Sequence, residues 1–229
     1  MPSAAKKSAD SEFKVIGTSP IRPDGVDKVT GRAKFGADLH LPGMLVGKIL
    51  RSPHPHARLI SIDTSRAEKL TGVKAIVTGK DFPEMPAPVG PQGPIYTDFR
   101  DITRSMMARE KVLFDGHPVA GVAATSEAVA KQALKLIRVK YKPLPHVIDP
   151  VEAMQPDAPV LHEKMITEGV EPTPKKPSNV AIRHQVSIGD IGAGFKAADV
   201  IVEREFNTKT VHQGYIEPQA CVASVSEDG

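Results

Sequence analysis

Proline constrains this chain more than any other residue. The 229-residue sequence holds 21 prolines, while aromatic residues make up only 4% and tryptophan is absent. Proline fixes φ and carries no backbone N–H, so it ends helices and stays out of central strands. This composition favours many short extended segments and turns over a helical bundle. Hydrophobic residues at 40% and charged residues at 25% are otherwise typical of a globular domain, which argues against a membrane protein or wholesale disorder.

The charged residues give little support for nucleic-acid binding. Thirty basic and 27 acidic residues leave a formal charge of +3, and the densest basic clusters are the pairs Lys6-Lys7 and Lys175-Lys176. We interpret both pairs as solvated. No aromatic residues are interleaved with these basic residues, so base stacking is not supported. We therefore expect no nucleic-acid partner.

Hydropathy and cysteine usage set further limits. No apolar run of 18 residues is present, so no membrane span is expected. Residues 1–10 are small and polar, and no apolar core of a secretory signal follows them, which makes the cytoplasm the expected location. Cys221 is the only cysteine, which excludes an internal disulfide and a cysteine-held iron–sulfur cluster or structural zinc site in this chain. If electrons leave this protein, we expect another chain to carry them.

Turn residues and periodicity divide the chain into four regions: a tail at 1–27, a compact unit at 28–150, a proline-rich connection at 151–178 and a second unit at 179–229. In the compact unit we expect strands over 44–51, 59–62, 73–78, 112–114, 119–124 and 138–141, and helices over 66–70 and 127–137. Thr125 or Ser126 caps the second helix. Asp115-Gly116 predicts a hairpin, and the proline-rich stretch 81–107 is expected to be irregular. The order predicts an α+β domain with its helices packed on a mixed sheet.

The second unit is expected to be an unfinished sheet. Alternating apolar residues predict strands over 180–186, 200–206 and 220–225, with a turn or short helix over 190–198. Asp228-Gly229 is a strong hairpin signal, yet no returning strand follows it. Because an unpaired apolar edge invites another strand, we expect a partner polypeptide to complete this sheet.

Several ordered segments carry a family resemblance that extends from about residue 16 to the end. They are VTGRAKFGAD at 29–38, PGML at 42–45, ILRSPHPHA at 49–57, GVKAIVT at 72–78, GHPVAGVAA at 116–124, YKPLP at 141–145 and HQGYIEPQAC at 212–221. Together they resemble the opening of the large subunit of the xanthine dehydrogenase and aldehyde oxidase family of molybdenum hydroxylases. The form of the last segment looks more like the bacterial aldehyde, aryl-CoA or carbon monoxide dehydrogenase types than eukaryotic xanthine oxidase.

The resemblance implies an α/β hammerhead domain followed by an incomplete molybdopterin-binding domain. It also implies oxidation of an aldehyde, an aromatic heterocycle, an aryl-CoA or carbon monoxide at a molybdenum–molybdopterin cofactor. Electrons would then pass to a 2Fe-2S cluster and FAD on partner chains. In the family, the glycine-rich segments that approach the pterin and the glutamate beside the metal lie downstream of these motifs. No catalytic, cofactor-binding or metal residue is therefore assigned in this chain.

Four polar residues nevertheless invite a functional interpretation. His54 and His56 could be metal ligands, but two ligands without a third make a poor site, and the family uses them as loop residues. His212 and Glu217 could act as an acid–base pair. The resemblance implies instead that this glutamate supports the domain around the cofactor, and a catalytic role would need a confirmed geometry.

Cys221 and a glycine cluster also have two interpretations each. Cys221 could be a reactive thiol, but it lies in an apolar strand pattern, where a free cysteine behaves as a small hydrophobic residue. Gly189, Gly192 and Gly194 are similar to a phosphate-binding loop. They lack the second half of a dinucleotide-binding motif, which favours a turn before a helix.

Two functional hypotheses follow. In the first, the chain is the N-terminal portion or a split subunit of a molybdenum hydroxylase, and a further polypeptide supplies the rest of the molybdopterin-binding domain. In the second, it is a non-catalytic binding or assembly module that kept the hammerhead scaffold. A sequence that is merely cut short would predict the same molecule as the first hypothesis. Molybdenum, iron and flavin in the native complex would distinguish the first hypothesis from the second.

Overall fold

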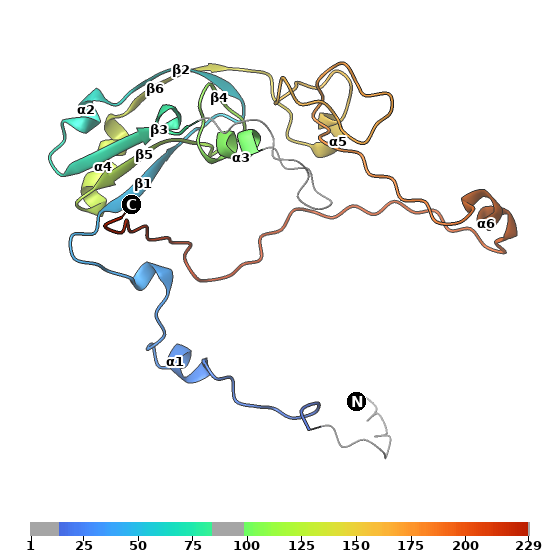
Figure 1. Cartoon of the computed structure of the whole chain (residues 1–229), viewed down its shortest axis with the longest axis horizontal. Helices are drawn as coiled ribbons and strands as arrows, with labels where there is room; N and C mark the ends of the chain where they lie inside the picture. The colour runs from blue at the N-terminus through green and yellow to red at the C-terminus, as the bar shows by residue number, and fades with distance from the viewer. Residues whose placement is uncertain (1–13, 84–98, 229) are drawn as a thin grey trace. The chain divides into compact units, whose positions relative to one another are not determined.

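The computed structural model describes residues 14–83 and 99–228 and divides the chain into two compact units. Of the described residues, 43–83 and 99–205 make up the larger unit, and 14–42 and 206–228 make up the smaller one. The larger unit contains β1 (Val46–Arg51), β2 (Ala57–Asp63), α2 (Ser65–Glu68), β3 (Val73–Thr78), η2 (Gly79–Asp81), α3 (Phe99–Met106), β4 (Lys111–Val112), β5 (Pro118–Ala124), α4 (Glu127–Leu136), β6 (Arg138–Pro143), α5 (Pro150–Ala153) and α6 (Ile191–Ala197) (Figure 1). The smaller unit contains α1 (Gly25–Val29) and η1 (Gly36–Asp38).

The described strands form two antiparallel sheets, in the orders β1-β5-β3 and β4-β2-β6. The expected α+β class is confirmed, but the expectation of one mixed sheet is wrong. The direction of a neighbouring strand depends on which distant segments meet, and an alternating apolar pattern is the same for either direction. Pro53 and Pro55 explain why β1 and β2 lie in different sheets: neither can donate a ladder hydrogen bond, so the chain leaves the first sheet at this point.

The Asp115-Gly116 turn forms, but it does not join paired strands. The N–H of His117 donates to the carbonyl of Phe114 at 3.1 Å, and Gly116 has a φ of +80°, which suits glycine. However, β4 pairs with β2, whereas β5 pairs with β1 and β3. Ser52 explains the difference, because its N–H donates to the His117 carbonyl and its carbonyl accepts from the Gly116 N–H, both at 2.9 Å. The chain after the turn thus extends the first sheet, and the predicted hairpin is wrong.

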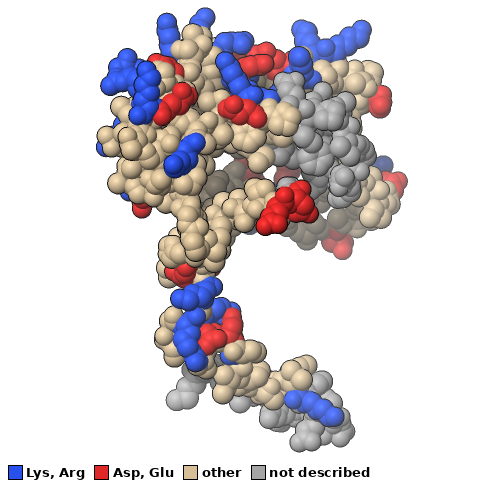
Figure 2. Space-filling model, turned by 60° about the vertical axis from the view of Figure 1, so that its left-hand side comes forward, with Lys and Arg blue, Asp and Glu red and all other residues tan. Residues whose placement is uncertain are grey.

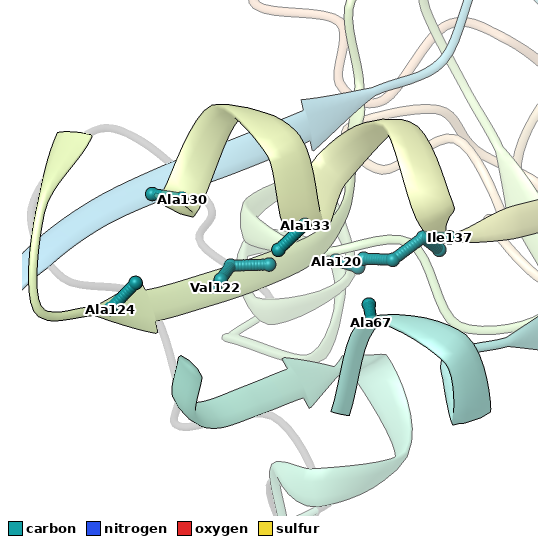
Figure 3. Packing of buried hydrophobic residues seen from close by; sticks show 7 residues of the cluster. All are labelled: Ala67, Ala120, Val122, Ala124, Ala130, Ala133 and Ile137. Atoms are coloured by element: carbon teal, nitrogen blue, oxygen red, sulfur yellow. The ribbon is translucent and has the colours of Figure 1, made fainter. Parts of the chain in front are cut away.

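The main core lies between α4, α2 and the sheet β1-β5-β3. Its buried members are small or branched residues: Ala67, Ala120, Val122, Ala124, Ala130, Ala133 and Ile137. Figure 3 shows the alanines of α4 lying over the side chains of β5. Alanine at these positions lets the helix approach the strand closely, so that burial is complete without large side chains. Ser126 begins the helix by accepting a hydrogen bond from the Val129 N–H, as one of the two expected caps.

The helix α3 lies within the stretch 81–107 that was expected to be irregular. Residues 84–98 of that stretch lie outside the described residues. The end of α3 is held by a tertiary contact, because the Arg104 carbonyl accepts a hydrogen bond from the His117 ring 2.9 Å away. Proline counts along the chain carry no information about such a contact, which explains why the helix was missed.

The strands expected in the second unit do not form in this structure. In the described chain after Pro143, only an isolated bridge between Glu168 and Ile182 is present, and residues 183–228 are exposed throughout. Of the turn or short helix expected at 190–198, the structure forms the helix α6. An alternating segment becomes a strand only where another strand supplies hydrogen bonds and apolar cover.

No helix in the described part of the chain is long and apolar enough to cross a membrane.

A glycine substitution tests the close approach of η2 to the segment that follows α3. A Cβ atom on Gly79 would overlap the backbone carbonyl of Ala108, which cannot move aside as a flexible side chain could. We expect Gly79→Ala to lower the free energy of unfolding by about 2 kcal/mol, measured by urea denaturation. Gly47→Ala is the matched control, since its Cβ would meet nothing within 4 Å. Equal denaturation midpoints for the two variants would contradict the packing described here.

Candidate functional site

A hydrogen-bonded loop between β1 and β2 carries two of the candidate residues. Ser52 is buried, and its hydroxyl accepts from the His54 N–H at 3.0 Å and donates to the His54 carbonyl at 3.1 Å. The His54 ring packs edge-on against Tyr141, with 4.9 Å between the ring centroids. Burial raises the pKa of Tyr141, and a hydrogen bond with Ser52 partly offsets that rise. These contacts hold the loop in one conformation.

His56 is committed to a different partner. Its side chain is buried, and Nδ1 lies 2.6 Å from the carbonyl oxygen of Pro145. A carbonyl oxygen only accepts, so Nδ1 carries the proton and donates. Nε2 is buried without a hydrogen-bond partner among the described residues. The described residues contain no group of three potential ligands that could hold a metal ion. In this structure His54 and His56 support the loop and its contact with the chain after β6.

His117, which the sequence did not single out, is the most buried histidine of the described chain. It is fully buried, Nδ1 accepts a hydrogen bond from the Leu113 N–H at 3.0 Å, and Nε2 donates to the Arg104 carbonyl at 2.9 Å. The Phe114 ring stacks on it at 4.3 Å. Burial lowers the pKa of His117, although hydrogen bonds to the backbone of Arg104 and Ser105 oppose the shift. The neutral ring therefore links α3 to the turn before β5. Nothing in the local sequence distinguishes this histidine from an exposed one.

The candidate acid–base pair is not assembled. His212 Nδ1 accepts a hydrogen bond from the Gly214 N–H at 3.0 Å, and its ring lies 5.0 Å from that of Tyr215. Glu217 and Cys221 are both exposed. The expectation that Cys221 lies in an apolar strand is therefore wrong here, because no strand forms to cover it. General acid–base catalysis needs a positioned pair in a water-excluding site, which these exposed residues do not provide.

The glycine cluster forms a turn and a short helix. Gly189 has a φ of +74°, and Gly192 and Gly194 lie within α6. The Asp190 carboxylate caps this helix by accepting from the Ala193 N–H at 2.9 Å. A carboxylate at this position uses a backbone donor and repels a phosphate, so the cluster is not a phosphate cradle in this structure.

The burial of His117 predicts a loss of stability in acid. Above the ordinary pKa of 6.5, the ring is neutral in both the folded and the unfolded state. As the pH falls below 6.5, the unfolded state binds the proton first, because burial lowers the folded-state pKa. The free energy of unfolding therefore falls until the pH passes the folded-state pKa. We expect urea denaturation between about pH 7 and pH 5 to show this loss.

Two variants separate His117 from the other titrating groups. His117→Gln cannot replace both ring hydrogen bonds, so we expect it to lower the free energy of unfolding by about 1–3 kcal/mol at neutral pH and to weaken the acid dependence. His184→Gln is the control, because His184 is exposed. An acid dependence that is unchanged in His117→Gln would assign the effect to other groups.

Two family models match the chain. The α/β hammerhead domain of aldehyde oxidase and xanthine dehydrogenase matches residues 30–145, and the molybdopterin cofactor-binding domain matches residues 172–229. A probable xanthine dehydrogenase subunit of Bacillus subtilis is 37% identical over 92% of this chain. The carbon monoxide dehydrogenase large chain of Afipia carboxidovorans is 34% identical over 99% of it. These matches cover only 25% and 27% of the two relatives' own lengths.

Solved structures agree with the family models. Reconstituted CO dehydrogenase from Oligotropha carboxidovorans superposes with a TM-score of 0.53 and 39% identity, over 63% of this chain and 17% of that one. The two antiparallel sheets and the helices that cover them lie within the residues that the hammerhead model matches. On the ordered motifs, the fold and these matches together, the chain belongs to the aldehyde oxidase and xanthine dehydrogenase family of molybdenum hydroxylases.

Proposed function

We propose that this chain supplies the hammerhead domain and the opening segment of the molybdopterin-binding domain of a molybdenum-dependent oxidoreductase. In this proposal a further polypeptide completes the active site. The observation that carries the proposal is the contrast within the chain. Residues 46–143 form two sheets with a buried core, whereas residues 183–228, which match the cofactor-binding model, are exposed throughout.

The residues present do not fit a pterin cofactor by themselves. Such a ligand needs a concave site that buries most of its surface and offers a few converging polar groups. Residues 183–228 of the matched segment offer exposed side chains and one short helix whose N-terminus is already capped. We therefore propose no catalytic, cofactor-binding or metal residue in this chain. When bound in the complete assembly, the cofactor would supply the oxidation chemistry, and this chain would supply part of its housing.

The exposed segment has the composition of a buried one. Its large apolar residues include Phe206 at 84%, Ile216 at 97% and Val225 at 84% exposure. Burying such side chains stabilises a protein by roughly 25 cal/mol per Å² of apolar area, so a surface that covers them gains substantial free energy. Contact with the completing polypeptide would provide that cover and would let the alternating segments pair as strands.

The proposal includes partner chains for the electrons. A cysteine-held 2Fe-2S cluster needs about four cysteines, and this chain has Cys221 alone. We propose that the 2Fe-2S cluster and FAD lie on other subunits. The relatives' names, one of which specifies a subunit and another a large chain, support such an assembly. The domain boundaries at residues 27, 150 and 178 and a cytoplasmic location remain part of the same proposal.

The proposal predicts that molybdenum accompanies the assembly and not the isolated chain. We expect native purification of the chain to recover it with further polypeptides, with molybdenum and iron in elemental analysis and a flavin absorption band. The same chain produced alone should carry no molybdenum. A native assembly without molybdenum, iron and flavin would favour the alternative of a non-catalytic binding or assembly module. A native chain recovered as a stable, monodisperse monomer would contradict the proposal.

A single substitution tests the apolar segment. Phe206→Asp places a charge where the proposal requires burial, so we expect at least about a tenfold loss of the co-purifying polypeptides, since each 1.4 kcal/mol of binding is about tenfold. Asn207→Asp adds the same charge at the next exposed position, which lies on the opposite face of a strand, and serves as the control. Equal recovery of the partners with both variants would exclude a buried role for Phe206.

A further inference from the structure

Three cations face one another across the sheet β4-β2-β6. In the strand register, Arg58 of β2 lies directly opposite Lys111 of β4 on one side and Lys142 of β6 on the other. Residues directly opposite in antiparallel strands share a face, with Cβ atoms about 5 Å apart. Like charges in such positions repel and destabilise the sheet. The row of three cations therefore lowers the free energy of unfolding, and packing within the sheet does not require charged residues at these positions.

The same face continues as a basic surface along β6. Lys140 lies opposite Ser61, and Arg138 lies opposite Asp63. The residues between them, Val139 and Tyr141, are partly buried and pack on the opposite face against the core. We call the face defined by Arg58, Lys111, Arg138, Lys140 and Lys142 the basic sheet face. In Figure 1, β2 and β6 lie along the upper side of the larger unit, and in Figure 2 Lys and Arg side chains stand out along that side.

Carboxylates neutralise only part of this face. Glu163 Oε1 lies 3.3 Å from both Arg58 and Lys111, so one carboxylate serves two cations. Asp63 attracts Arg138, but it also accepts hydrogen bonds from the backbone and hydroxyl of Ser65. Lys140 and Lys142 form no ion pair with any described residue. Two exposed ammonium groups are therefore available on the side of the row away from Glu163.

We propose that the basic sheet face is a docking surface for an acidic patch on a partner protein. Ile60, on β2 near Arg58, is 52% exposed and provides an apolar contact within the charged surface, as protein interfaces commonly do. A second copy of this chain would present the same positive face, so a symmetric dimer through it would be repelled. A nucleic acid is disfavoured because Tyr141, the aromatic residue of β6, faces the core and is not available for base stacking. The proposal concerns a surface of the hammerhead part and does not depend on cofactor chemistry.

The test measures binding of the full chain to a fluorescent poly-L-glutamate peptide by anisotropy at low salt. We expect the wild-type chain to bind and the affinity to fall as salt is added, because exposed charges are screened. Lys140→Glu with Lys142→Glu should weaken binding at least about tenfold, since both charges are reversed within the face. Lys140→Gln with Lys142→Gln should give an intermediate loss and covers the case in which the reversed pair fails to fold.

The control changes the same net charge elsewhere. Lys74→Glu with Lys135→Glu alters exposed lysines on β3 and α4, away from this sheet, and should stay within about threefold of the wild type. An equal loss in the control would reduce the effect to net charge and overturn the proposal. A wild-type chain that does not bind poly-L-glutamate would also overturn the proposal. The same holds for one that binds oligothymidylate more tightly than the acidic peptide.

Discussion

The burial of β5 is the constraint on which the rest of the structure depends. This strand pairs on both sides, with β1 and with β3, and Val119, Ala120, Val122 and Ala124 are fully or nearly fully buried. Its residues are small: Ala120 and Ala124 belong to the core cluster packed under α4, and Gly121 lies where a Cβ atom would come within 3.1 Å of the Val77 side chain. A central strand of small residues lets a helix and two neighbouring strands approach it closely, so the core is dense despite the low aromatic content of the chain. The helix α4 follows β5 directly, which fixes the helix on the sheet that it covers.

Histidines connect this core to the irregular parts of the chain. His117, immediately before β5, accepts from the Leu113 backbone and donates to the Arg104 backbone, and so it joins three segments. His56 donates to the Pro145 carbonyl and ties the loop before β2 to the chain after β6. The neutral imidazole of His117 suits this task because one ring nitrogen donates while the other accepts. These contacts give His56 and His117 a structural role in joining the loops to the core.

The chain combines a packed part with an exposed one, and this contrast shapes its proposed function. The hammerhead strands satisfy their hydrogen bonds within the chain, apart from the sheet edges, and bury their apolar faces. Residues 183–228, which match the cofactor-binding model, do neither. The family membership agrees with the exposure of Phe206 and Ile216 if this segment forms its sheet together with a further polypeptide. The basic sheet face adds a second surface whose charges are not balanced within the described chain.

The sequence by itself determined the local elements of the compact unit. Strand β3 was predicted at the residues where it forms, and Ser126 was one of two expected caps of α4, because periodicity and capping depend on neighbouring residues. The order of the motifs along the chain also identified the family.

Tertiary structure alone decided which strands pair. The Asp115-Gly116 turn forms as expected, but backbone hydrogen bonds with Ser52, which is far from Gly116 in the sequence, direct β5 into a different sheet from β4. The burial of His117, the row of three cations and the absence of strands in the described residues after 143 likewise depend on contacts between distant segments, and sequence periodicity carries no information about those.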